Sequence, residues 1–123
     1  MYALLIYGDD SSWVDLPDEE KARLRAEEIP DWLVLFDELK ESDPNYAGKE
    51  LDGRRTAKVV SVRDGEQTVT DGPFAETKEL IGGVFILDLP DLDEAIRLAA
   101  RIPAARHGSI EIRPVIEPGS APA

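Results

Sequence analysis

The segment Val84–Leu87 constrains the fold most, because its sequence VFIL is apolar at every position. Successive side chains of a strand point to opposite faces of a sheet, so a strand that is apolar throughout needs cover on both faces. The two glycines that precede it, Gly82 and Gly83, indicate a bulge or a close approach of backbone. We therefore expect a central strand with apolar partners on both sides.

Short apolar or alternating runs predict the other strands, and a turn dipeptide connects two of them. Asp64-Gly65 is typical of a two-residue hairpin turn. The segment ESDPNYAGKELDG, which begins at Glu41, is rich in turn residues and predicts an irregular connection. The remaining predicted strands are Tyr2–Tyr7, Thr56–Arg63, Glu66–Thr70 and, with Pro114 as an edge or end signal, Ser109–Ile116.

Two helices are expected between these strands. The first has Asp15 as its predicted N-cap and Pro17 in its first turn, and Pro30 predicts a kink or a restart. The second has Asp91 and Glu94 as a capping-box pair. A spacing of three to four residues predicts the apolar face of the first helix as Ala22, Ala26, Ile29, Leu33, Phe36 and Leu39 or Lys40.

The order strand, helix, strand, inserted hairpin, strand, helix, strand predicts an α+β fold with a ferredoxin-like split βαβ sheet. Residues 1–116 are expected to form one domain, and residues 117–123 a flexible tail. Two helices cover one face of the sheet only, so the apolar strand leaves the other face in need of cover. The two remedies are a homodimer packed sheet to sheet, and the segment Glu41–Arg55 folding across that face.

Composition narrows the classes of partner. The 26 acidic and 14 basic residues give a formal net charge of −12, which disfavours binding to nucleic acid and to anionic membranes. The chain has no cysteine, and no apolar run approaches the length of about 20 residues that spans a bilayer. We expect a cytoplasmic protein without a metal site or a cofactor.

Four motifs carry a resemblance to a known family. The segments Asp71–Glu79 (DGPFAETKE), Gly82-Gly83, Leu92–Ala95 (LDEA) and Gly108–Val115 (GSIEIRPV) resemble the DGPF-domain branch of the YCII-related proteins. The resemblance implies a ferredoxin-like domain that forms a dimeric α/β barrel. It also implies bacterial cytoplasmic proteins that occur beside, or fused to, extracytoplasmic-function sigma factors.

The broader YCII-related group is associated with a histidine–aspartate pair in a pocket, and the resemblance places Asp71 at the aspartate position. The histidine that it implies in the first helix region is missing, since the single histidine, His107, precedes the last predicted strand. Asp71 therefore has two interpretations, which are compatible. It is a pocket carboxylate that acts as a general base or anchors a ligand, or it caps the turn by accepting N–H groups of Phe74 or Ala75.

The neighbouring candidate residues also have two interpretations each. Glu76, Lys78 and Glu79 line a polar pocket or form a solvated rim. Glu111 and Arg113, two apart on the last strand, face the same cavity as Asp71 or form an exposed or interfacial ion pair. Gly72 is expected to supply an unusual backbone geometry, Pro73 to stiffen it and Phe74 to plug the turn. The candidate set is Asp71 as catalytic residue, with Gly72, Pro73, Phe74, Glu76, Lys78, Glu111 and Arg113 as ligand-binding residues.

Three functional hypotheses follow. The first is a homodimeric module that binds a small molecule or a protein partner, with a sigma-factor link that rests on the family resemblance alone. The second is an enzyme that uses Asp71 as general acid or base on a small polar substrate. The third is a structural dimer without a pocket.

Overall fold

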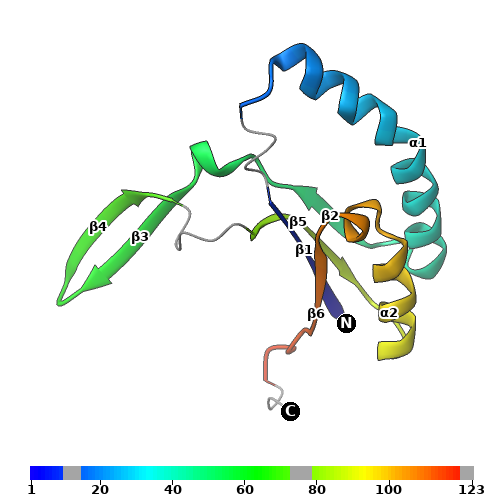
Figure 1. Cartoon of the computed structure of the whole chain (residues 1–123). Coiled ribbons are helices and arrows are strands. Elements are labelled where there is room, and N and C mark those ends of the chain that lie inside the picture. Colours follow the sequence, from blue (N-terminus) through cyan, green and yellow to red (C-terminus); the bar gives the residue numbers. More distant parts are fainter. Residues whose placement is uncertain (10–14, 73–78, 120–123) are drawn as a thin grey trace.

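The computed structural model describes residues 1–9, 15–72 and 79–119, and it contains a four-stranded sheet, a separate two-stranded hairpin and two helices (Figure 1). In chain order the elements are β1 (Tyr2–Asp9), α1 (Asp18–Ser42), β2 (Ala47–Glu50), the 3-10 turn η1 (Arg54–Thr56), β3 (Lys58–Arg63), β4 (Glu66–Asp71), β5 (Glu79–Leu87), α2 (Leu92–Arg101), the 3-10 turn η2 (Pro103–Arg106) and β6 (Ser109–Pro114).

The order of strands in the large sheet is β2-β5-β1-β6, and every neighbouring pair is antiparallel. Strands β1 and β2 therefore run parallel with β5 between them, and α1 connects them. In the same way β5 and β6 run parallel with β1 between them, and α2 connects them. These are two interleaved split βαβ units, so the predicted ferredoxin-like α+β fold is confirmed.

The fourth strand of this sheet was not predicted. Strand β2 comes from the segment that we expected to be an irregular connection, and it pairs with β5 at the edge of the sheet. Its sequence AGKE has little strand propensity, so pairing decides its conformation. Gly48 allows that pairing, because a Cβ atom there would lie 2.5 Å from the ring of Phe85. Residues 47–50 thus extend the sheet edge and do not cross its uncovered face.

The predicted hairpin exists, but it stands apart from the large sheet. Strand β3 pairs only with β4 among the described strands, and the turn between them has positive φ at Asp64 (51°) and Gly65 (78°). Positive φ at both central residues is typical of the tight turn that joins two twisted strands. The turn was predicted correctly, and the two strands that it joins form a hairpin outside the four-stranded sheet.

Helix α1 buries a face that matches the predicted one only in part. Leu39 enters the core as predicted and Leu35 joins it, whereas the predicted Ile29 and Leu33 are more than half exposed. The helix is continuous through Pro30 and does not restart there, although Figure 1 shows it changing direction along its length. Its N-cap is Pro17 rather than Asp15. The core comprises Leu4, Leu35, Leu39, Phe85, Leu87, Leu89, Ala95, Leu98 and Ile102.

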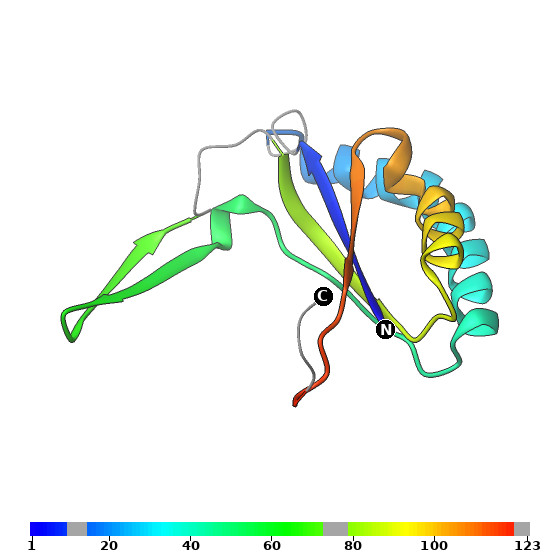
Figure 2. The same ribbon diagram turned by 90° about the horizontal axis from the view of Figure 1, so that it is seen from below.

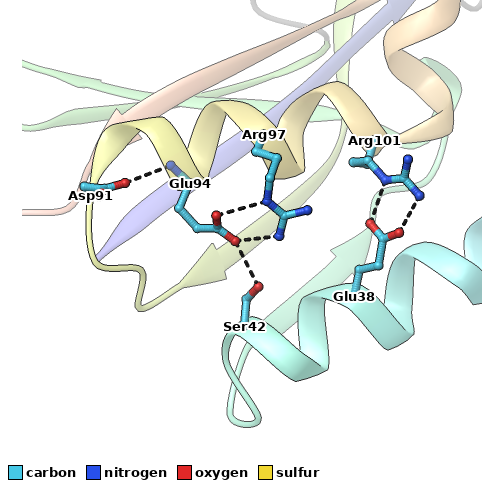
Figure 3. Close-up of polar contacts among 6 residues, drawn as sticks. All are labelled: Glu38, Ser42, Asp91, Glu94, Arg97 and Arg101. Carbon is cyan, nitrogen blue, oxygen red and sulfur yellow. Dashed lines mark hydrogen bonds and ion pairs between the residues drawn. The ribbon is translucent and has the colours of Figure 1, made fainter.

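Helix α2 begins as predicted, and polar contacts connect it to α1 (Figure 3). The carboxylate of Asp91 accepts the backbone N–H of Glu94 at 2.9 Å. Glu94 also accepts the hydroxyl of Ser42 at 3.2 Å, and the Arg101 guanidinium donates to both carboxylate oxygens of Glu38. These contacts join the two helices into one layer on one face of the sheet.

Candidate functional site

The face of the four-stranded sheet opposite the helices, called the open face below, has an apolar centre. The pairing register places Leu5 of β1 beside Val84 of β5, and these residues alternate with the core residues Leu4 and Phe85. Ile86 lies two residues beyond Val84 and is also partly exposed. Figure 2 shows both helices on the other side of the sheet, so no helix of the described chain covers this face.

A bulge in β5 shapes one end of the open face. Ile6 pairs with Gly83, whereas the next residue, Tyr7, pairs with Ile81, so Gly82 is the extra residue. The predicted bulge at the two glycines is therefore confirmed. Because of this bulge, Ile81 lies directly opposite Tyr7.

Polar side chains line the β6 side of the same face. The register aligns Leu5 with Glu111 and Ala3 with Arg113, so Glu111 and Arg113 point to the same side, as predicted. The hydroxyl of Tyr7 donates to Oε1 of Glu111 at 3.1 Å. This side of the open face therefore carries a phenol, a carboxylate and a guanidinium next to its apolar centre.

The phenol of Tyr7 is a weaker acid than an ordinary tyrosine side chain. Desolvation, followed by the hydrogen bond to Glu111 and the charge of that carboxylate, raises the pKa of Tyr7. Tyr7 is therefore a neutral hydrogen-bond donor at neutral pH. Tyr7 was not predicted as a site residue. The sequence shows that Tyr7 lies two residues after Leu5 and so on the same face of the strand, but it does not show that Tyr7 lies close to β6.

Asp71 lies elsewhere, at the end of β4 in the hairpin. It pairs with Lys58 across the two strands, and the Lys58 ammonium donates to its carboxylate. The hydrogen bond and charge of Lys58 lower the pKa of Asp71, whose side chain is 87% exposed. A general base works best with a pKa near the working pH, so this environment suits an ionised, structural carboxylate better than proton transfer. The catalytic role of Asp71 stays a prediction.

The structure places Asp71 and Glu111 in different sheets, so it does not bring together these two predicted site residues. Gly72 donates its N–H to the carbonyl of Ala57 at 2.8 Å, and its φ lies outside the left-handed region. The unusual backbone geometry predicted for Gly72 was wrong. A Cβ atom at this position would lie 3.0 Å from Cβ of Ala57, so close approach of two segments explains the glycine.

The remaining predicted residues of the motif, Pro73, Phe74, Glu76 and Lys78, lie outside the described residues. His107 lies in the turn before β6, where it was expected, and is exposed. Across residues 1–9, 15–72 and 79–119, no three histidine or acidic side chains are grouped in a way that would hold a metal ion. No helix in these ranges is both long and apolar enough to cross a membrane.

Comparison with known proteins identifies the family of the chain. A sequence model of the YCII-related domain matches residues 1–118. The chain is also 32% identical over 126 residues to uncharacterized protein R00369 of Rhizobium meliloti (strain 1021), with 99% of this chain and 98% of that protein covered. The chain therefore belongs to the YCII-related domain family.

Proposed function

We propose that this protein is a homodimeric ligand-binding module, in which two copies pack their open faces together and a small polar molecule binds at the β6 side of the contact. The observation that carries the proposal is the apolar centre of the open face, formed by Leu5, Val84 and Ile86. Both helices lie on the other side of the sheet. An apolar face of this kind usually marks an interface.

The charges on β6 support a second copy as the occupant. A two-fold interface brings the same surface of both partners together. If residue i of the first copy contacts residue j of the second, then residue j of the first copy contacts residue i of the second. Glu111 and Arg113 have opposite charges and lie two residues apart on one side of an edge strand. Two antiparallel β6 strands related by a two-fold axis near Ile112 would pair Glu111 of one copy with Arg113 of the other.

The polar groups define the ligand class. Glu111 accepts hydrogen bonds, and Arg113 donates them to a carboxylate or another oxygen group. The hydroxyl oxygen of Tyr7, whose proton is donated to Glu111, accepts one. The ligand is thus a small molecule with both an acidic group and a hydrogen-bond donor. The motif that begins at Asp71 leads into β5. The first residue of β5 pairs with Asp9, at the same end of the open face as Tyr7.

The dimer is tested by light scattering on a size-exclusion column. Wild-type protein is expected to elute as a dimer, and Val84→Glu as a monomer, because a carboxylate that replaces an apolar side chain in the centre of the contact loses its hydration there. Ile96→Glu is the matched control, since Ile96 is half exposed on the outer side of α2. A wild-type monomer, or a Val84→Glu dimer, contradicts the proposal.

Ligand binding is tested by a thermal-shift screen with amino acids and small hydroxy and keto acids. A ligand that binds only the folded state stabilises it by an amount that grows with the logarithm of the ligand concentration relative to its dissociation constant, so a binding compound raises the midpoint of unfolding. We expect Arg113→Gln and Tyr7→Phe to abolish that rise, and Ile96→Glu to keep it. A rise that is unchanged in Arg113→Gln and Tyr7→Phe would place the ligand elsewhere.

The proposal extends to cellular role by family resemblance. The motifs at Asp71–Glu79 and Gly108–Val115 support membership of the DGPF branch, and hence a cytoplasmic protein in extracytoplasmic-function sigma-factor regulation. Binding to the purified sigma factor of a neighbouring gene, measured by calorimetry, tests this role. Absence of heat with that sigma factor at saturating concentration would count against it.

A further inference from the structure

The hairpin Lys58–Asp71, called the arm below, has no extensive packing surface among the described residues of its own protomer. In the described part of the chain β3 and β4 contact each other, and neither packs extensively on a helix or on the large sheet. Figure 1 shows the arm projecting away from the rest of the molecule. A lone two-stranded hairpin is at best marginally stable in water, so the arm needs another surface.

One face of the arm is apolar and exposed. Val60 and Val69 lie directly opposite each other, and Val62 is the next residue of β3 on the same side. Their side chains are 60%, 55% and 59% exposed, respectively. The ion pair of Lys58 and Asp71 lies on the same side at the base of the arm. An apolar strip with a charged base is suited to contact with a protein surface rather than with water.

The direction of the arm identifies what covers this strip. Figures 1 and 2 show the arm on the side of the sheet opposite α1 and α2, which is the side of the open face. A molecule that sits on the open face therefore lies beside the arm.

We propose that the arm is a clasp that holds a second copy of this chain, with Val60, Val62 and Val69 packed against the copy that occupies the open face. The inference rests on the homodimer proposed above. Two-fold symmetry provides two arms, one from each copy, so each protomer holds its partner. In this arrangement Asp71, the first residue of the DGPF motif, fixes the base of the clasp through Lys58.

The first test replaces the paired valines by threonine. Val60→Thr/Val69→Thr keeps the size and the branching at Cβ, so the hairpin conformation is retained while the strip becomes polar. We expect the dimer dissociation constant, measured by sedimentation velocity on dilution, to rise by at least about tenfold. The matched control is Val34→Thr, since Val34 is 54% exposed on α1. A dissociation constant that rises no more in the arm variant than in the control overturns the clasp.

The second test locates the arm directly. The chain has no cysteine, so Val62→Cys introduces a single attachment point for a photo-cross-linker. Light and isotopically heavy protein are mixed, allowed to exchange subunits and irradiated. We expect cross-linked peptides that combine light and heavy chains. Cross-links confined to chains of one isotope composition would show that the arm contacts its own protomer, and they would overturn the proposal.

The two tests separate this inference from the proposed homodimer. A wild-type protein that is monomeric at every concentration refutes the homodimer and the clasp together. A dimer that Val84→Glu dissociates, but whose arm yields only cross-links within one protomer, refutes the clasp and leaves the homodimer supported.

Discussion

The replacement Leu35→Ala tests which face of α1 stabilises the fold. Leu35 is 2% exposed in the core between α1 and the sheet, whereas Leu33, two residues earlier in the same helix, is 56% exposed. Sequence periodicity predicted the opposite assignment, with Leu33 in the core. The two leucines thus form a matched pair that differs only in environment.

The expected magnitude follows from burial. Leu→Ala removes three carbons, which are worth about 0.8 kcal/mol each when fully buried, or about 2.4 kcal/mol in total. Incomplete collapse of the cavity adds to this loss, so Leu35→Ala should lower the free energy of unfolding by about 3–4 kcal/mol. Leu33→Ala loses less than half of the transfer term and leaves no cavity, so its loss should be about 1 kcal/mol or less.

Urea unfolding followed by circular dichroism measures both losses. The protomer concentration is held constant, because dimerisation makes apparent stability depend on concentration. The slope of the transition should be the same in both variants, so the midpoints report stability directly. Equal losses in the two variants, or a larger loss for Leu33→Ala, would refute the assignment of the buried face.

Two further predictions concern a glycine and an ion pair. Gly108→Ala should destabilise the protein strongly, because its Cβ would lie 2.0 Å from the carbonyl oxygen of Tyr7. Gly82→Ala should be tolerated, because no atom lies within 4 Å of the added Cβ. Thermal unfolding of both variants measures the difference. The hydrogen bond from Arg101 and its charge lower the pKa of Glu38. Its stabilising contribution is therefore present above the ordinary glutamate pKa and is lost as pH falls through the lowered pKa. In urea unfolding from about pH 7 to about pH 3, wild type should lose its advantage over Glu38→Gln. An advantage that stays constant over this range would contradict the role of the ion pair.

The sequence determined features that depend on residues close together in the chain. Asp64-Gly65 specified the hairpin turn, since positive φ is tolerated there, and Asp91 specified the start of α2, because its carboxylate reaches an N–H three residues on. The double glycine specified the bulge in β5. The apolar run at Val84–Leu87 specified a central strand, which lies between β2 and β1 in the structure.

The tertiary structure decided what depends on contacts between distant segments. Strand β2 forms from a sequence with little strand propensity because β5 offers an edge and Gly48 admits the ring of Phe85. Helix α1 has apolar residues on more than one side, and only packing on the sheet selected Leu35 over Leu33. Asp71 and Glu111 are likewise separated by the folding of the hairpin away from the sheet. Local spacing fixes which way neighbouring side chains point, but the surface that they meet is set by chain segments tens of residues away.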